Sequence, residues 1–128
     1  MLNPTIAAYI FCAFTIVVVS FQFALALGVP WGEMAMGGKF PGRLPPQMRV
    51  AALVQITLLV VIALIVLIRA GLTFSEYFEF SKSAIWFVVA FNIISAILNT
   101  LTPSKKERIL WAPVTIFLLV CSFIVAIG

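Results

Sequence analysis

The sequence contains no histidine and very little charge: charged residues make up 9% of its 128 residues. Without histidine, catalysis by a histidine base is excluded, and the commonest ligand of zinc and related metals is missing. The two cysteines, Cys12 and Cys121, both lie inside apolar segments, so no zinc pattern or CxxC redox motif is present. We therefore predict no metal, no cofactor and no catalytic residues, and we expect both cysteines to act as small apolar side chains.

Hydrophobic residues, in contrast, make up 64% of the chain, well above the roughly 45–50% of soluble domains. A soluble domain of this size could not bury so much apolar surface, because its surface-to-volume ratio is high. The excess is therefore predicted to face lipid. The net charge of +4 comes from basic residues in short segments beside apolar runs. There they indicate membrane orientation rather than nucleic-acid binding.

Four apolar runs are each long enough to cross the hydrocarbon core, which takes about 20 helical residues. They cover residues 5–27, 50–68, 83–101 and 110–127, approximately, and none contains a charged side chain. A transmembrane barrel would instead show alternating segments of about ten residues. The predicted fold is all-α: one transmembrane domain, 1–128, built as an antiparallel four-helix bundle. Ser104 and Glu107 have the spacing of a capping box, which offers an earlier start for the fourth helix.

The distribution of basic residues predicts the orientation of this bundle. Loops one and three share one side in an antiparallel arrangement, and together they hold six basic residues, against two on the other side. The six are Lys39, Arg43, Arg49, Lys105, Lys106 and Arg108; the two are Arg69 and Lys82. Basic loops remain in the cytoplasm, so we predict cytoplasmic loops one and three, with both termini outside.

The first loop, residues 28–49, is rich in Gly and Pro, which specify turns rather than a helix. It also carries Trp31 and Phe40, whose large apolar side chains are not typical of a flexible linker. We therefore predict an ordered loop packed over the bundle end. Two interpretations stay open. Glu33, Lys39 and Arg43 offer charges beside an aromatic wall, as in a lid or binding surface. Alternatively, the loop is a structural plug that caps the helices.

Polar side chains recur within the third span. Asn92, Ser95 and Asn99 share one helical face, and Gln22 and Gln55 offer partners on other helices. Uncharged polar groups in lipid usually bond across helices, so helix association is one interpretation and a polar pocket or permeation path is the other. Every glutamate is expected in a loop or near a span boundary, which disfavours ion-coupled transport.

Two segments carry a resemblance to known proteins. The first combines Trp31-Gly32, Gly37-Gly38 and Leu44-Pro45, and the second is Glu-Arg-x-x-Trp-x-Pro, from Glu107 to Pro113. Together they resemble an uncharacterised family of short bacterial four-helix integral membrane proteins. The resemblance implies a fold and a location in the bacterial inner (cytoplasmic) membrane, and no activity.

The shared side of loops one and three suggests specific contacts between them. We expect Glu33 to pair with Arg108 or Lys105, and Trp111 to pack on the Pro/Gly-rich loop.

The leading functional hypothesis is a non-enzymatic membrane protein. It would bind membrane lipids or a protein partner through its first loop, or form a homo-oligomer. The alternative is a small-solute facilitator or channel with a polar path along Asn92, Ser95 and Asn99. A third hypothesis, an enzyme acting on lipids, would need Glu33 with Lys39 or Arg43 for its chemistry.

Overall fold

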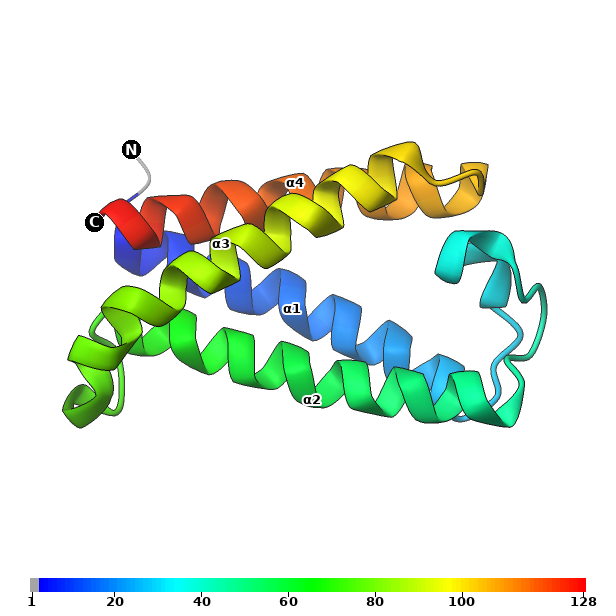
Figure 1. The fold of residues 1–128 in the computed structure, drawn as a ribbon, viewed down its shortest axis with the longest axis horizontal. Coiled ribbons are helices and arrows are strands. Elements are labelled where there is room, and N and C mark those ends of the chain that lie inside the picture. Colours follow the sequence, from blue (N-terminus) through cyan, green and yellow to red (C-terminus); the bar gives the residue numbers. More distant parts are fainter. Residues whose placement is uncertain (1–2) are drawn as a thin grey trace.

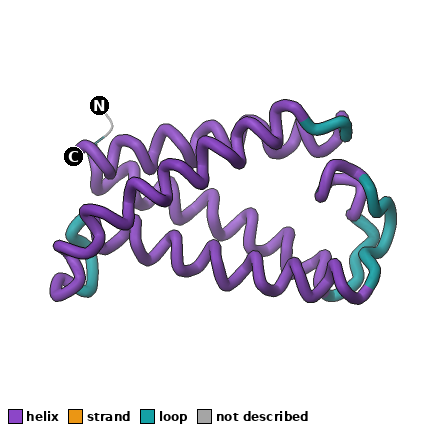
Figure 2. Tube along the Cα trace, viewed as in Figure 1, coloured by secondary structure: helices purple, strands orange, loops and turns teal. Residues whose placement is uncertain are grey.

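Four long helices make up most of the protein, for which the computed structural model describes residues 3–128. They are α1 (Pro4–Ala26), α2 (Pro46–Arg69), α3 (Phe78–Leu101) and α4 (Lys105–Ile127). Short 3-10 turns interrupt the connections: η1 (Gly32–Met34) and η2 (Met36–Gly38) in the first loop, and η3 (Ser75–Tyr77) in the second. No strand occurs in the described part of the chain (Figure 2). The predicted all-α four-helix fold is confirmed.

The last three helices begin several residues earlier than hydropathy predicts. Helix α2 begins at Pro46 rather than near residue 50, α3 at Phe78 rather than near 83, and α4 at Lys105 rather than near 110. Each added turn carries charged or polar residues, which an apolar window leaves out. The spacing of Ser104 and Glu107 marks the start of α4 correctly, because Ser104 Oγ accepts a hydrogen bond from the Glu107 N–H at 3.2 Å.

Each of the four helices is long and apolar enough to cross a membrane. The shortest has 23 residues, which corresponds to about 34 Å at 1.5 Å per residue and matches the hydrocarbon core. The large side chains on the outer faces are apolar and exposed, among them Phe87 and Leu101. The chain is a multi-pass membrane protein.

The helices run antiparallel, so the connections alternate between two ends of the bundle (Figure 1). The two termini and the second loop lie at one end, called here the terminal end. The first loop (residues 27–45) and the third loop (102–104) lie at the other, called the loop end. Towards the loop end, the α3–α4 pair diverges from the α1–α2 pair (Figure 1).

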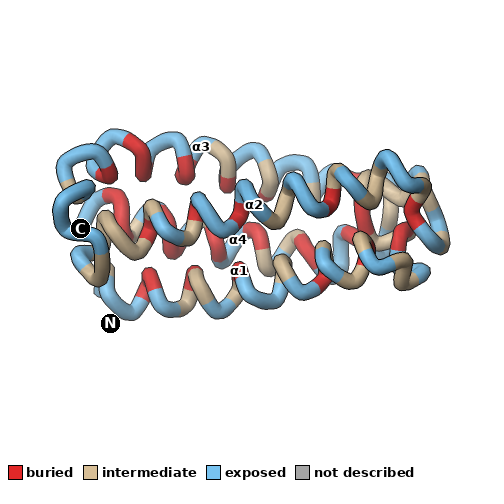
Figure 3. The backbone as a smooth tube through the Cα atoms, turned by 90° about the horizontal axis from the view of Figure 1, so that it is seen from below, coloured by how far each residue is buried: buried red, intermediate tan, exposed pale blue. Residues whose placement is uncertain are grey.

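The terminal half holds a close-packed apolar core. Its fully buried members include Ala7, Ala8, Val66 and Ile85, each with no exposed surface. Small residues on α1 let the neighbouring helices approach closely, as is usual in membrane bundles. Buried positions recur along the inward faces of the helices (Figure 3).

Two arginines tie helix ends together. Arg49, in the first turn of α2, donates from Nε to the Ala26 carbonyl oxygen at the end of α1, at 2.9 Å. Arg69, in the last turn of α2, donates from Nη2 to the Ala126 carbonyl oxygen at the end of α4, at 3.2 Å. The last carbonyls of a helix lack intrahelical donors and carry partial negative charge. Each arginine therefore caps the C-terminal end of a neighbouring helix.

Candidate functional site

A cavity of about 320 Å³ lies between the four helices in the loop half of the bundle. The first loop contributes part of its wall through Met34, Ala35 and Met36. Aromatic side chains from three helices form another part: Phe11, Phe21, Phe91 and Trp111. The uncharged polar members are Thr15, Gln22, Gln55, Asn92, Ser95, Asn99 and Thr115. Such a mostly apolar wall with a few polar groups is typical of a small-molecule site.

The three polar residues predicted on α3 all line this cavity. Asn92 is buried, and its Nδ2 donates to Ser122 Oγ of α4 at 3.2 Å. Asn99 Nδ2 donates to the Ser95 carbonyl oxygen within its own helix at 2.7 Å. Asn92 therefore acts across helices, as the helix-association interpretation expects, while all three also contribute polar surface to a pocket.

Gln22 and Gln55 were expected to bond to the polar residues of α3, and they do not. Within residues 3–128, no hydrogen bond joins either of them to the polar residues of α3. Both side chains line the cavity instead, so their amides are available to a ligand.

The first loop is ordered because its backbone is packed against itself and against the helices. Gly32 is buried, and its N–H donates to the Gly42 carbonyl oxygen at 2.9 Å. A Cβ on Gly32 would lie 1.9 Å from the Phe40 carbonyl oxygen, so only glycine permits this close approach. Leu44 and Ala35 bury their side chains with Phe21 and Trp111 in a second apolar cluster.

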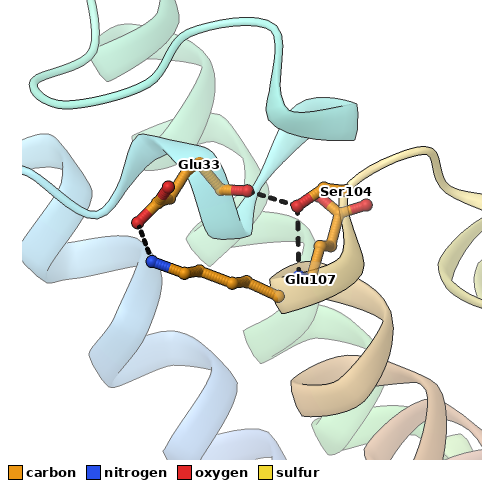
Figure 4. Close-up of polar contacts among 4 residues, drawn as sticks. Glu33, Ser104 and Glu107 are labelled. Atoms are coloured by element: carbon orange, nitrogen blue, oxygen red, sulfur yellow. Dashed lines mark hydrogen bonds and ion pairs between the residues drawn. The ribbon is translucent and has the colours of Figure 1, made fainter.

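Two hydrogen bonds from the side chains of Ser104 and Trp111 attach backbone carbonyls of the loop to the start of α4. Trp111 Nε1 donates to the Met34 carbonyl oxygen at 2.9 Å. Ser104 Oγ donates to the Glu33 carbonyl oxygen at 2.6 Å (Figure 4). The expected packing of Trp111 on the loop is therefore found. Trp111 is buried, and the carbonyl satisfies its indole N–H, as a buried tryptophan requires.

The loop glutamate pairs with the third loop, although with a different lysine from those expected. Glu33 Oε1 lies 2.7 Å from Lys106 Nζ (Figure 4). Arg108 instead donates to the Thr102 carbonyl oxygen at 3.4 Å, and Lys105 is exposed. The expectation of Arg108 or Lys105 was wrong: all three basic residues lie in the first turn of α4, where successive side chains point in different directions, and Lys106 is the one that faces Glu33.

The five predicted loop residues do not line the cavity. Trp31 stacks on Phe21 with ring centroids 6.1 Å apart, and Phe40 packs half-buried against the apolar cluster. Lys39 and Arg43 are exposed. The loop residues that reach the cavity are their apolar neighbours, so the charges lie on the outer face of the loop and the apolar side chains on its inner face.

The residue that sequence reasoning missed is Glu107. It was predicted to lie near a span boundary, and it does, but it is only 6% exposed and lines the cavity. Its Oε2 accepts a hydrogen bond from the Gly37 N–H at 3.1 Å. A signal was present: Glu107, Trp111, Thr115 and Leu118 recur at helical spacing and form the inward face of α4.

Glu107 is the only ionisable side chain in the lining of the cavity. Across the described residues, no three side chains of the metal-binding types come together, and both cysteines are free thiols. What the arrangement offers is therefore binding: a carboxylate, several amides and hydroxyls, and aromatic faces.

No protein-family model, curated protein or solved structure matches the chain.

Proposed function

We propose that this membrane protein binds a small amphipathic molecule, or part of a lipid, in the cavity, with the first loop as its lid. The observation that carries the proposal is the cavity itself, which combines an apolar wall with polar groups converging from all four helices and lies beneath an ordered loop. The proposal makes the protein a non-enzymatic binder. In support, the lining contains one carboxylate and no second ionisable group to work with it as an acid–base pair.

The lid function is supported by how the loop is attached. Its polar contacts with the start of α4 are three hydrogen bonds and one exposed ion pair, each worth from a few tenths to about 3 kcal/mol, and Ala35 and Leu44 share an apolar cluster with Trp111. Such contacts can open without unfolding the helices. The loop also contributes methionines to the wall, and methionine adapts readily to ligands of different shape.

For location we propose the bacterial cytoplasmic membrane, with the loop end in the cytoplasm. This rests on the family resemblance and on the six basic residues at the loop end against two at the other. Five of the six are exposed, all except Arg49, and exposed basic side chains are suited to anionic headgroups.

Native mass spectrometry of gently extracted protein tests the proposal. We expect a retained small molecule or lipid at fixed stoichiometry. Ala51→Leu adds bulk to the cavity wall and should abolish retention, whereas Ala90→Leu, on the exposed side of α3, should leave it unchanged. Equal retention by both variants, or a protein that carries nothing, would contradict cavity binding.

A facilitator for small solutes is the second candidate, favoured by the polar groups of Asn92, Ser95 and Asn99 in the cavity wall. Passage through the protein would require the close-packed core of the terminal half to open. Solute uptake by proteoliposomes distinguishes the two candidates: flux above that of empty liposomes, abolished by Ala51→Leu, would favour the facilitator.

A further inference from the structure

We propose that the ligand of the cavity carries a positively charged nitrogen, an amine or guanidinium, and that the Glu107 carboxylate is its counter-charge. This inference rests on the proposed function, since it names the class of molecule that the cavity takes. It begins from the sign of the charge: Glu107 contributes the only formal charge in the lining, and that charge is negative.

The Glu107 carboxylate has no basic partner within the described residues. The nearest lysine in the chain, Lys106, directs its ammonium to Glu33 at 2.7 Å. Arg108 donates to the Thr102 carbonyl, and Arg49 to that of Ala26. A carboxylate that is 6% exposed and lacks a cation is unusual, because buried charges are normally paired.

Local structure supports the charge without neutralising it. Glu107 lies in the first turn of α4, where the helix dipole favours an anion, and Oε2 accepts the Gly37 N–H. Gly37 has a φ of +69°, a backbone conformation that glycine adopts readily. No hydrogen bond to Oε1 occurs in the part of the chain described. One carboxylate oxygen is therefore held by the lid, and the other is available to a ligand.

The remaining wall suits an organic cation rather than a metal ion. Phe21 and Trp111 meet edge-to-face with ring centroids 4.7 Å apart, and both line the cavity beside Glu107. Aromatic faces attract ammonium and guanidinium groups, while amide oxygens such as that of Gln55 accept their N–H bonds. A cavity of about 320 Å³ accommodates a charged group together with an apolar body.

The test compares three probes of similar size: 2-phenylethylammonium, 2-phenylethanol and 3-phenylpropanoate. Each is titrated calorimetrically into the full-length protein in neutral detergent, with protein-free micelles as the blank. We expect the ammonium to bind about tenfold or more tightly than the alcohol, the scale of one hydrogen bond to a charged group, and the carboxylate to bind most weakly. Because this comparison uses the unaltered chain, it does not depend on the folding of any variant.

Glu107→Gln should bind the alcohol as the unaltered protein does and lose the preference for the ammonium. Glu79→Gln is the matched control, since Glu79 is an exposed carboxylate outside the cavity, and it should keep the preference. Equal affinity for all three probes, or a preference that survives in Glu107→Gln, would overturn the inference. If Ala51→Leu abolishes that equal binding, the cavity proposal stands and only the charge is wrong. If no probe binds, both proposals fail.

An amine can come from an aminophospholipid headgroup or from a soluble molecule. Titration of 2-phenylethylammonium in phosphatidylglycerol nanodiscs, with and without phosphatidylethanolamine, separates the two sources. Weaker apparent binding in the presence of phosphatidylethanolamine indicates a lipid headgroup. Unchanged binding indicates a soluble amine.

Discussion

The two halves of the bundle are built from the same four helices and differ in what fills the space between them. In the terminal half, alanines and branched apolar residues of all four helices close the interior, with Ala8, Val66 and Ile85 fully buried. In the loop half, the helix pairs diverge (Figure 1) and amides, hydroxyls and one carboxylate surround a cavity. The difference shows that four apolar spans can pack closely in one half of a bundle and enclose a cavity in the other. In the loop half, the first loop forms part of the cavity wall.

The loop half depends on its lid, and the largest expected effect comes from breaking that lid. Gly32→Ala would bring a Cβ within 1.9 Å of the Phe40 carbonyl oxygen and 2.6 Å of that of Gly42, so the loop backbone must move. We expect a loss of about 3 kcal/mol, at the upper end for forced overpacking. Unfolding in mixed dodecyl sulfate–maltoside micelles measures the loss, and limited proteolysis measures the exposure of the loop.

The control for this variant is Gly42→Ala. Gly42 has a φ of +79° but open space around its Cβ position, so only the left-handed conformation costs free energy, about 1 kcal/mol. Equal effects of the two substitutions would show that the close approach at Gly32 does not matter.

The halves should also differ in their tolerance of added volume. Ala8→Leu inserts three carbon atoms into the close-packed core, where Ala8 has no exposed surface, and should cost about 2 kcal/mol of unfolding free energy. Ala51→Leu, in the cavity wall, should change stability by less than about 0.5 kcal/mol because the space exists. The same unfolding assay compares them. A larger cost for Ala51→Leu would remove the distinction between the halves.

A smaller effect is expected from the bond between the lid and α4. Trp111→Phe keeps an aromatic ring but removes the Nε1 donor that binds the Met34 carbonyl at 2.9 Å, and should cost about 1 kcal/mol. Trp86→Phe is the matched control, since Trp86 is 47% exposed on the lipid-facing side of α3. Hydrogen exchange of the first loop should rise for the first variant only, and a rise for both would point to a general loosening.

The smallest effect is expected from the outer ion pair. Lys106→Ala removes the partner of Glu33, and both side chains are about half exposed or more, at 66% and 47%. Exposed pairs contribute roughly 0.2–1 kcal/mol and are screened by salt. We expect a loss of a few tenths of a kcal/mol that disappears at high salt. Lys105→Ala should show no loss at any salt concentration, and a salt-independent effect of Lys106→Ala would mean that its stem, not its charge, matters.

The number, direction and approximate extent of the helices follow from the sequence because each span must supply about 20 apolar residues. That the first loop is ordered also follows from the sequence, because its Gly and Pro residues specify turns and its Trp31 and Phe40 side chains are apolar. Helix starts were placed too late because hydropathy excludes charged first turns. The partner of Glu33 was wrong for a different reason: the sequence indicates which loops meet, while the orientation of α4 about its axis decides which basic residue of its first turn faces Glu33.

A polar pocket along α3 was one of two open interpretations, but the extent of the cavity could not be predicted, because it depends on how far two helix pairs diverge and on which loop side chains point inward. The amides of α3 gave part of the signal. To predict the inward position of Glu107, one must notice that Trp111 and Thr115 follow it at helical spacing on the same face of α4. Glu107 lies near the end of a span, as expected of every glutamate, but it is buried and lines the same cavity as the amides of α3.

The arginine caps at the two ends of α2 have a consequence for biosynthesis. Arg49 closes the end of α1 across 23 residues of chain, so the first hairpin carries its own cap when it leaves the translocon. The end of α4 is capped by Arg69, made 57 residues before its Ala126 partner. In nascent chains that end before α4, we therefore expect the α1–α2 hairpin to have its Arg49 cap. Arg69 would not yet have the Ala126 carbonyl to bind. Insertion of α4 then supplies the Ala126 carbonyl, and the hydrogen bond from Arg69 of α2 can form.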